Sequence, residues 1–155
     1  MGQKVNPHGL RVGVIKDWDS RWYARNDKVG DLIVEDYKIR KFLKKTLYSA
    51  GVPTIEIERD SNKVRIYIHC SRPGVIIGKG GAEIEKLQAQ VSKMIGKPVA
   101  LSIVEVRTPD TNAQLVAENI AGQLERRIGF RRAMKNAMGR AMRMGAKGIK
   151  VMCGG

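Results

Sequence analysis

A glycine-rich run with one lysine has the residue types best suited to contact a phosphate chain. The run is Gly78-Lys79-Gly80-Gly81, and it joins an apolar stretch to a helical pattern. Glycine lets a backbone approach a sugar-phosphate chain where any Cβ would clash. A loop that opens a helix also points free N–H groups at an anion, and Lys79 adds a charge on a flexible stem. We therefore predict a site for a nucleic-acid backbone here.

Apolar side chains flank this loop and predict a groove for bases. The candidate walls are Val75, Ile76 and Ile77 before the loop and Ile84 after it, with Arg72 as a further basic residue ahead of them. Single-stranded nucleic acid presents unstacked bases, and an apolar groove beside a backbone clamp would accept them. A glycine turn with a purely structural role is the alternative.

The same residues exclude a nucleoside-triphosphate hydrolase of the P-loop type. That motif needs four residues between its first glycine and the Gly-Lys pair, whereas three separate Gly74 from Gly78. Gly80 also occupies the position of the hydroxyl that binds magnesium.

A second group of charged residues lies near the C-terminus. From Arg126 onward every charged residue is basic, although solvated faces usually mix both signs. The pattern favours a phosphate-contacting surface over a merely solvated one. Its members are Arg126, Arg127, Arg131, Arg132, Lys135, Arg140, Arg143, Lys147 and Lys150.

The first 29 residues predict a basic tail without a sustained period. Trp18, Trp22 and Tyr23 lie among its charges. They either pin the tail to the folded part, which we favour, or stack on bases.

Composition limits the classes of function. The 29 Lys and Arg against 15 Asp and Glu give a net charge of +14, which favours a polyanionic partner. No stretch is apolar and long enough to span a membrane. Two cysteines without a C-x-x-C fit a reducing compartment, which is the cytoplasm or the interior of an organelle. With only His8 and His69 and no metal-ligand spacing, we expect no catalysis, metal, cofactor or small-molecule substrate.

Periodicity predicts the order of the elements. We expect a helix over 31–49, paired strands near 55–58 and 64–69, a helix from Ala82, a strand over 99–106, two helices over 109–128 and 131–144, and a strand over 149–152. The second of the late helices carries Met134, Met138, Ala141 and Gly145 on one side. The predicted division is a tail at 1–29, a domain at 30–107, and basic helices opening a further α/β domain at 108–155.

The string from Val75 to Ile84 resembles the KH signature, which is an apolar run, a G-x-x-G loop and an isoleucine three residues later. A helix and hairpin ahead of the loop match the prokaryotic-type order. The resemblance implies an α+β fold, a type II KH domain whose three-stranded mixed sheet is packed by helices. Such domains clamp single-stranded nucleic acid.

Three strings together resemble the family of bacterial-type small-subunit ribosomal protein three. They are Gly2–Gly13, the KH string, and the segment from Gln123 to Val151. The resemblance implies binding to small-subunit rRNA in the head, with Lys4, Asn6, His8 and Arg11 of the tail as rRNA contacts. It implies ribosomal proteins ten and fourteen as neighbours, and proteins four and five near the mRNA entry. There Arg131, Arg132 and Lys135 would contact incoming mRNA.

Family members continue past the final Gly-Gly into a second α/β domain, so we expect a continuation beyond Gly155. The alternative function is a free KH-type factor in RNA maturation or decay. Such a factor would share the loop and the charge, but it would not need the first or third string.

Overall fold

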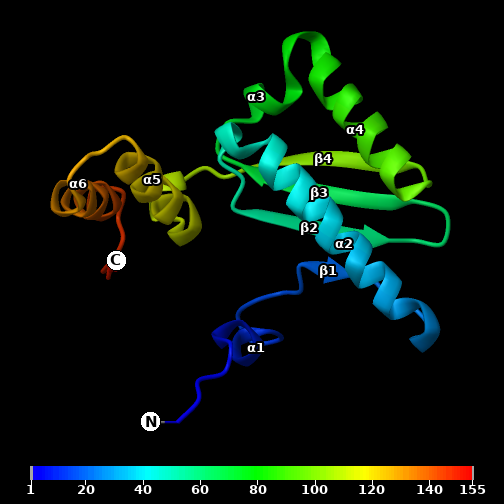
Figure 1. Ribbon diagram of the computed structural model, residues 1–155, viewed down its shortest axis with the longest axis horizontal. Coiled ribbons are helices and arrows are strands. Elements are labelled where there is room, and N and C mark those ends of the chain that lie inside the picture. The colour runs from blue at the N-terminus through cyan, green and yellow to red at the C-terminus, as the bar shows by residue number, and fades with distance from the viewer. Residues whose placement is uncertain (1, 155) are drawn as a thin grey trace.

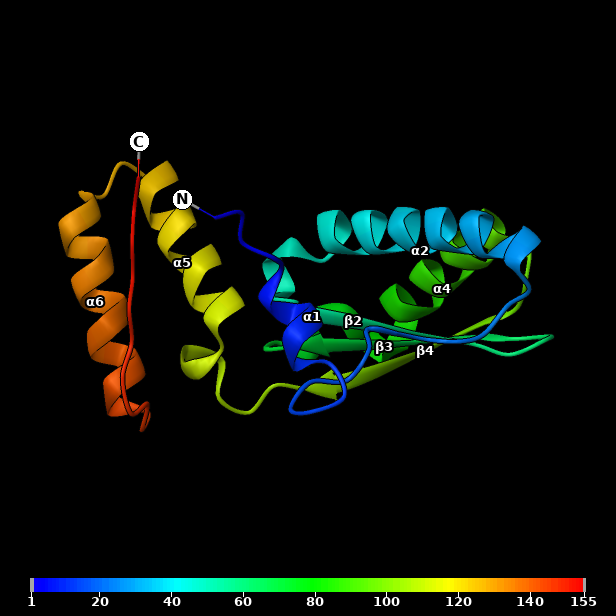
Figure 2. The same ribbon diagram turned by 90° about the horizontal axis from the view of Figure 1, so that it is seen from below.

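The computed structural model describes residues 2–154 and consists of a sheet unit, a helical pair and an N-terminal arm (Figure 1). The sheet unit contains β1 (Ser20–Arg21), β2 (Thr54–Arg59), β3 (Val64–Cys70) and β4 (Val99–Glu105). Two helices, α2 (Asn26–Thr46) and α4 (Ala82–Ile95), lie together on one face of this sheet (Figure 2). The predicted α+β class is confirmed. Met1 and Gly155, which bound the predicted tail and last domain, lie outside the described residues.

The sheet is mixed and has the order β1-β2-β3-β4. β2 and β3 pair antiparallel, whereas β1 pairs with β2 and β4 with β3 in parallel. The prediction of three strands is one short, because Ser20 and Arg21 of the expected tail join the edge beside β2. Arg21 forms ion pairs with Glu56 and Glu58, and the Glu56 carboxylate is the main cause that raises the pKa of Arg21.

The core lies between the sheet and its two helices. Ile39 and Leu43 of α2 and Val91 of α4 are fully buried against Ile66 and Ile68 of β3. Ile39 and Leu43 are four residues apart, which places both side chains on one face of α2. Burying each such side chain contributes roughly 1.5–3 kcal/mol, so this small layer fixes the face of the sheet on which both helices lie.

Two helix boundaries differ from the predictions. α2 begins at Asn26, inside the expected tail. The prediction missed this start because the first turn is polar and shows no apolar period. It ends at Thr46 and is followed by a 3₁₀ turn, η1 (Tyr48–Ala50). The apolar stretch ahead of the glycine loop, for which no helix was predicted, forms the short helix α3 (Pro73–Ile77) with Pro73 in its first turn, as proline's fixed φ favours.

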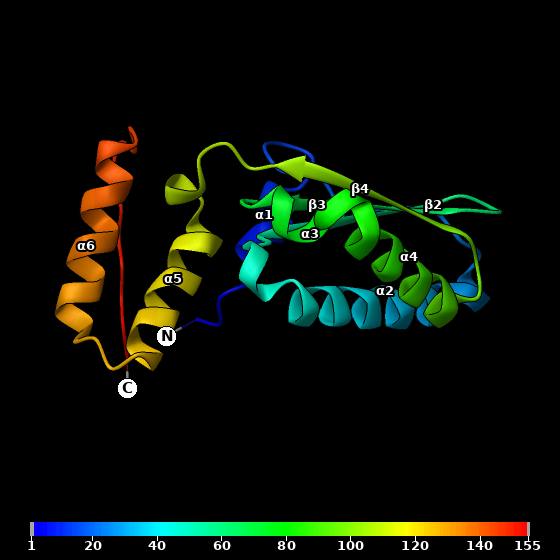
Figure 3. The same cartoon turned by 90° about the horizontal axis from the view of Figure 1, so that it is seen from above.

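The helical pair follows a 3₁₀ turn, η3 (Pro109–Thr111), and consists of α5 (Ala113–Glu125) and α6 (Phe130–Arg143). Asn112 caps α5, since its side-chain oxygen accepts bonds from the backbone N–H groups of Gln114 and Leu115 at 3.1 and 3.3 Å. This cap explains why α5 begins after the predicted position. Figure 3 shows the pair beside one end of the sheet unit.

α6 packs through alanines. Of the predicted stripe of Met134, Met138, Ala141 and Gly145, only Ala141 is buried. The buried positions are Ala133, Ala137 and Ala141, which recur every four residues. Ala133 and Ala137 pack with Ile120 of α5. Met134 and Met138 are half-buried at the border of this stripe. Small side chains suit a close approach of the two helices. The sequence prediction favoured the larger residues beside the alanines instead.

The predicted strand at 149–152 is wrong. These residues are irregular and run alongside α6 (Figure 2), with Val151 packed against the Ile120 cluster. A strand needs a hydrogen-bonding partner, and within residues 2–154 no other chain segment pairs with this one.

Candidate nucleic-acid interface

The glycine loop, residues 78–81, joins α3 to α4 and contains a 3₁₀ turn over Lys79–Gly81 (η2). Gly78, Gly80 and Gly81 all have positive φ, of 70°, 65° and 85°. A Cβ at Gly78 would also lie 2.5 Å from Cγ of Glu83. At Gly80 and Gly81 a Cβ would meet nothing within 4 Å, so there only the backbone angle selects glycine. Lys79 and Gly80 are exposed, which leaves the loop open to a ligand.

The apolar residues around the loop divide into two groups. Val75 and Ile77 are 50% and 41% exposed, and Ile84 is half-buried. Ile76 is buried in the core cluster. Most of the Ile76 side chain therefore packs into the core. A cleft of about 260 Å³ between α3, α4 and the end of α2 is lined by both Val75 and Ile76, so the role of these residues as groove walls stays a prediction.

A cationic face covers the turn between α5 and α6 and the outer side of α6. We define it as Arg126, Arg127, Arg131, Arg132, Lys135, Arg143 and Lys147, all of which are exposed. Within residues 2–154 none of these side chains forms an ion pair with a carboxylate. With 3.6 residues per turn, the members on α6 lie about opposite the alanine stripe. The helix thus packs with one side and presents positive charge on the other.

Arg140 does not belong to that face, although it was predicted among the basic residues. It is half-buried and donates from Nη2 to Oδ1 of Asn119 on α5 at 2.8 Å. Its role is to join the two helices.

The arm, residues 2–25, contains the short helix α1 (Pro7–Arg11). Two of its predicted rRNA contacts have local structural roles. The Asn6 side chain accepts from the His8 N–H at 2.9 Å, and Arg11 donates to the Pro7 carbonyl at 3.1 Å. Lys4 and His8 are exposed.

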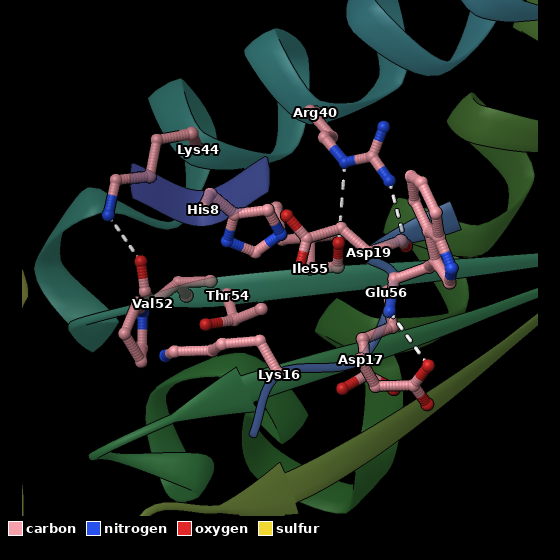
Figure 4. A pocket seen from close by; sticks show the side chains of 12 residues that line it. His8, Lys16, Asp17, Asp19, Arg40, Lys44, Val52, Thr54, Ile55 and Glu56 are labelled. Atoms are coloured by element: carbon pink, nitrogen blue, oxygen red, sulfur yellow. Dashed lines mark hydrogen bonds between the residues drawn. The ribbon is translucent and has the colours of Figure 1, made fainter. Parts of the chain in front are cut away.

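A cleft of about 490 Å³ separates the arm from β2. His8 and Lys16 of the arm line it together with Arg40 and Lys44 of α2 (Figure 4). Arg40 is occupied, because it donates to the backbone oxygens of Asp19 and Ile55. The cleft is lined by both signs of charge, including Asp17, Asp19 and Glu56.

Asp36 anchors the arm, and it was missed by sequence reasoning. This carboxylate is 2% exposed and accepts from Ser20 Oγ at 2.7 Å and Trp22 Nε1 at 2.8 Å. Arg59 of β2 donates to its other oxygen at 2.9 and 2.6 Å. The feature in the sequence that could have revealed it is its position three residues before Ile39, which places this acidic residue on the buried side of α2.

The aromatic residues of the arm have different environments. Trp22 pins the arm through Asp36, as the favoured interpretation held. Trp18 and Tyr23 are 63% and 94% exposed, and Trp18 lines the cleft beside β2, so neither residue is buried as an anchor of the arm.

One ion pair joins the sheet unit to the helical pair in the described part of the chain. Lys44 of α2 lies 2.6 Å from Glu118 of α5, and Gln114 also donates to this carboxylate at 2.7 Å. Leu115 lies close to Gly51, where a Cβ would be 3.5 Å from Cδ2 of the leucine. These contacts, with the linker after β4, set the direction in which the cationic face points.

Over residues 2–154, no group of three or more His, Cys, Asp and Glu side chains is placed to hold a metal ion. In the same range, no helix has the length and apolar character needed to cross a bilayer.

Two family models match the chain. A KH domain matches residues 38–111, and the C-terminal domain of ribosomal protein S3 matches residues 120–155. Small ribosomal subunit protein uS3 of Agathobacter rectalis is 65% identical over 155 residues, which are all of this chain and 71% of the relative. The chain belongs to the uS3 family. Its uS3 relatives from Clostridioides difficile and Lachnoclostridium phytofermentans are each 64% identical, and the chain covers 58% and 70% of their lengths.

Membership in the uS3 family confirms the resemblance inferred from the three sequence strings. The match to a KH domain confirms the KH assignment. The KH match begins within α2 and ends at η3, so it contains the glycine loop. The arm lies ahead of both family models, but the uS3 relatives align with it, because each covers the whole chain.

Proposed function

We propose that this chain is a structural component of the small ribosomal subunit, which binds rRNA in the head and contacts mRNA at its entry. The observation that carries this proposal is the alignment of uS3 proteins over the whole chain. The exposed, unpaired cationic face supports it, because phosphate neutralisation with counterion release is the main source of affinity for nucleic acids.

Within this role we propose the three predicted parts, namely a basic tail at 1–29 that contains the arm, a KH domain at 30–107, and the start of a C-terminal domain at 108–155. The arm and the glycine loop would contact rRNA, with Lys4, His8 and Lys79 supplying charge. Arg131, Arg132 and Lys135 would contact mRNA. Their exposure and their common side of α6 support the assignment.

The proposed setting is the cytoplasmic ribosome. The neighbours would be ribosomal proteins ten and fourteen, with proteins four and five near the mRNA entry. The chain would act by binding, without a catalytic step or a cofactor.

Sedimentation tests the proposal directly. A lysate that contains the tagged chain is fractionated on a gradient at high salt. We expect the chain to travel with the small subunit and to remain there through the salt wash. A chain that stays at the top of the gradient, free or on short RNA, would instead support the separate KH-type factor.

Translation of structured messages tests the mRNA contacts. Small subunits carrying Arg131→Ala, Arg132→Ala and Lys135→Ala together should assemble, because these side chains are exposed and unpaired. They should translate messages with stable hairpins more slowly than the wild type and unstructured messages at the same rate. Equal rates on both messages would refute the assignment of these residues to mRNA.

A further inference from the structure

Phe130 is an exposed aromatic residue that the packing of the helical pair does not use. It is the first residue of α6 and is 49% exposed. The cluster that joins α5 to α6 contains Ile120, Ala133 and Ala137, with Val116, Ile128 and Val151 around them, and Phe130 is not part of it. The ring is therefore available for a contact outside the described chain.

The surroundings of this ring are cationic. The Arg131 guanidinium lies over it, 5.5 Å from the ring centroid. Arg126 and Arg127 lie in the turn just before it, and Arg127 is the one residue other than glycine with positive φ in the described range. No carboxylate forms an ion pair with these arginines within residues 2–154.

An aromatic ring among arginines recognises a different state of RNA from the one that arginines alone recognise. Phosphate contacts position a nucleic acid, but they are available on paired and unpaired strands alike. A base can stack on a protein ring only after it has left its duplex partner. Stacking of this kind tolerates any base, because every base has a π-face.

We propose that Phe130 is a stacking site for an unpaired base of the RNA held by the cationic face. This inference rests on the proposed function and adds to it a preference for unpaired over paired RNA. The Arg131 guanidinium lies over one face of the ring. A base stacks on the other face, so that guanidinium, phenyl ring and base form three layers. The phosphates bind the neighbouring arginines. The face then favours single strands over duplex, which is what a site that keeps an entering message open requires.

The two phenylalanines of the chain allow a direct measurement. Phe42 and Phe130 are the only ones, and Phe42 packs against the core of the sheet unit. The 155-residue chain labelled with 4-fluorophenylalanine gives one fluorine resonance from each. On addition of a short unstructured RNA we expect the Phe130 resonance to move upfield through the ring current of a base. The Phe42 resonance should stay in place and serves as the internal control.

An abasic chain of equal length separates stacking from charge. This probe keeps every phosphate and sugar but has no bases, so it should leave the Phe130 resonance where it was. Phe130→Leu should bind the base-containing RNA about tenfold more weakly and the abasic chain as tightly as the wild type does. Phe130→Tyr should retain both affinities. A Phe130 resonance that does not move, or that moves equally with the abasic chain, overturns the proposal.

Translation assays distinguish a failure of the stacking inference from a failure of the proposed mRNA contact. Small subunits with Phe130→Leu should translate structured messages more slowly, and those with Phe130→Tyr should not. If Phe130→Leu has no effect while the Arg131, Arg132 and Lys135 triple variant does, the mRNA contact stands and the stacking inference fails. If the triple variant has no effect either, the proposed mRNA contact itself fails.

Discussion

Gly78 is the loop residue at which both backbone and neighbours require glycine. Its φ of 70° and ψ of −173° lie in a region that is open almost only to glycine. We expect Gly78→Ala to lower the free energy of unfolding by about 1–3 kcal/mol or more, because the new Cβ also meets Glu83. Urea unfolding measures the change.

Gly74→Ala is the matched control, since Gly74 lies in α3 with open space around it. That variant should be neutral or slightly more stable. Equal losses for the two variants would contradict the argument from backbone geometry.

Asp36 is the residue on which the position of the arm depends. In Asp36→Ala the buried Arg59 would lose its two bonds to Asp36 and, among residues 2–154, keep only Glu35, which is 39% exposed, as an ionic partner. Removing one member of a buried pair costs about 3–5 kcal/mol, and because Glu35 remains we expect a loss near the lower end of that range in urea unfolding. Trp22 should also gain solvent exposure, which its fluorescence reports.

Asp31→Ala is the control on the same helix. Asp31 is exposed, and within residues 2–154 it forms no ion pair, so the free energy of unfolding should change by less than about 0.5 kcal/mol. If both variants were equally stable, Asp36 would not anchor the arm.

At the scale of elements, the alanine stripe of α6 sets its distance from α5. Ala137→Leu inserts a larger side chain into that contact and should cost about 1–3 kcal/mol through overpacking. Hydrogen exchange of the α5 and α6 amides measures the effect locally. Asn136→Leu, at the next and exposed position, should leave exchange unchanged. Faster exchange in both variants would mean that a leucine at any position of this turn, and not overpacking at Ala137, loosens the pair.

The elements also show what the sequence could predict. The hairpin of β2 and β3, α4 and the glycine loop follow from period and glycine placement, and the structure has them. β1 could not be predicted, because a two-residue strand has no period and is held by ion pairs from distant residues. The strand expected at 149–152 was wrong for a related reason, since β-structure depends on a partner that local pattern does not reveal.

The candidate site divides in the same way. The exposure of Arg131, Arg132 and Lys135 follows from a charge pattern that period alone could place on one side of a helix. The burial of Ile76 and the inward bond of Arg140 could not be predicted, because an apolar run does not say which of its members faces the core. The position of Asp36 on the apolar side of a helix could be recognised in the sequence. Its partners could not, because they come from β2 and the arm.

At the scale of the whole molecule, unpaired charge makes RNA binding depend on salt. Each phosphate contact on single-stranded nucleic acid adds about 0.7 to the slope of log K against log salt. Removing Arg131, Arg132 and Lys135 should therefore reduce the slope for an unstructured RNA by about 2. Titrations at several salt concentrations measure it.

The control removes equal charge elsewhere, through Lys38, Lys41 and Lys45, which are exposed on α2. That variant should keep nearly the wild-type slope. Equal reductions in both variants would mean that net charge, and not the cationic face, governs binding.

The narrow connection between the sheet unit and the helical pair also determines how the molecule would respond to force. Under the proposed function, a message drawn across α6 would pull on the helical pair, while the arm and the glycine loop would hold the sheet unit to the rest of the subunit. The load would then pass through the backbone between β4 and η3 and through the Lys44–Glu118 ion pair. Because the ion pair is not covalent, it would break before the backbone does, and the helical pair would then turn slightly while the sheet unit stayed anchored. The connection would act as a compliant joint between a fixed base and a surface under tension.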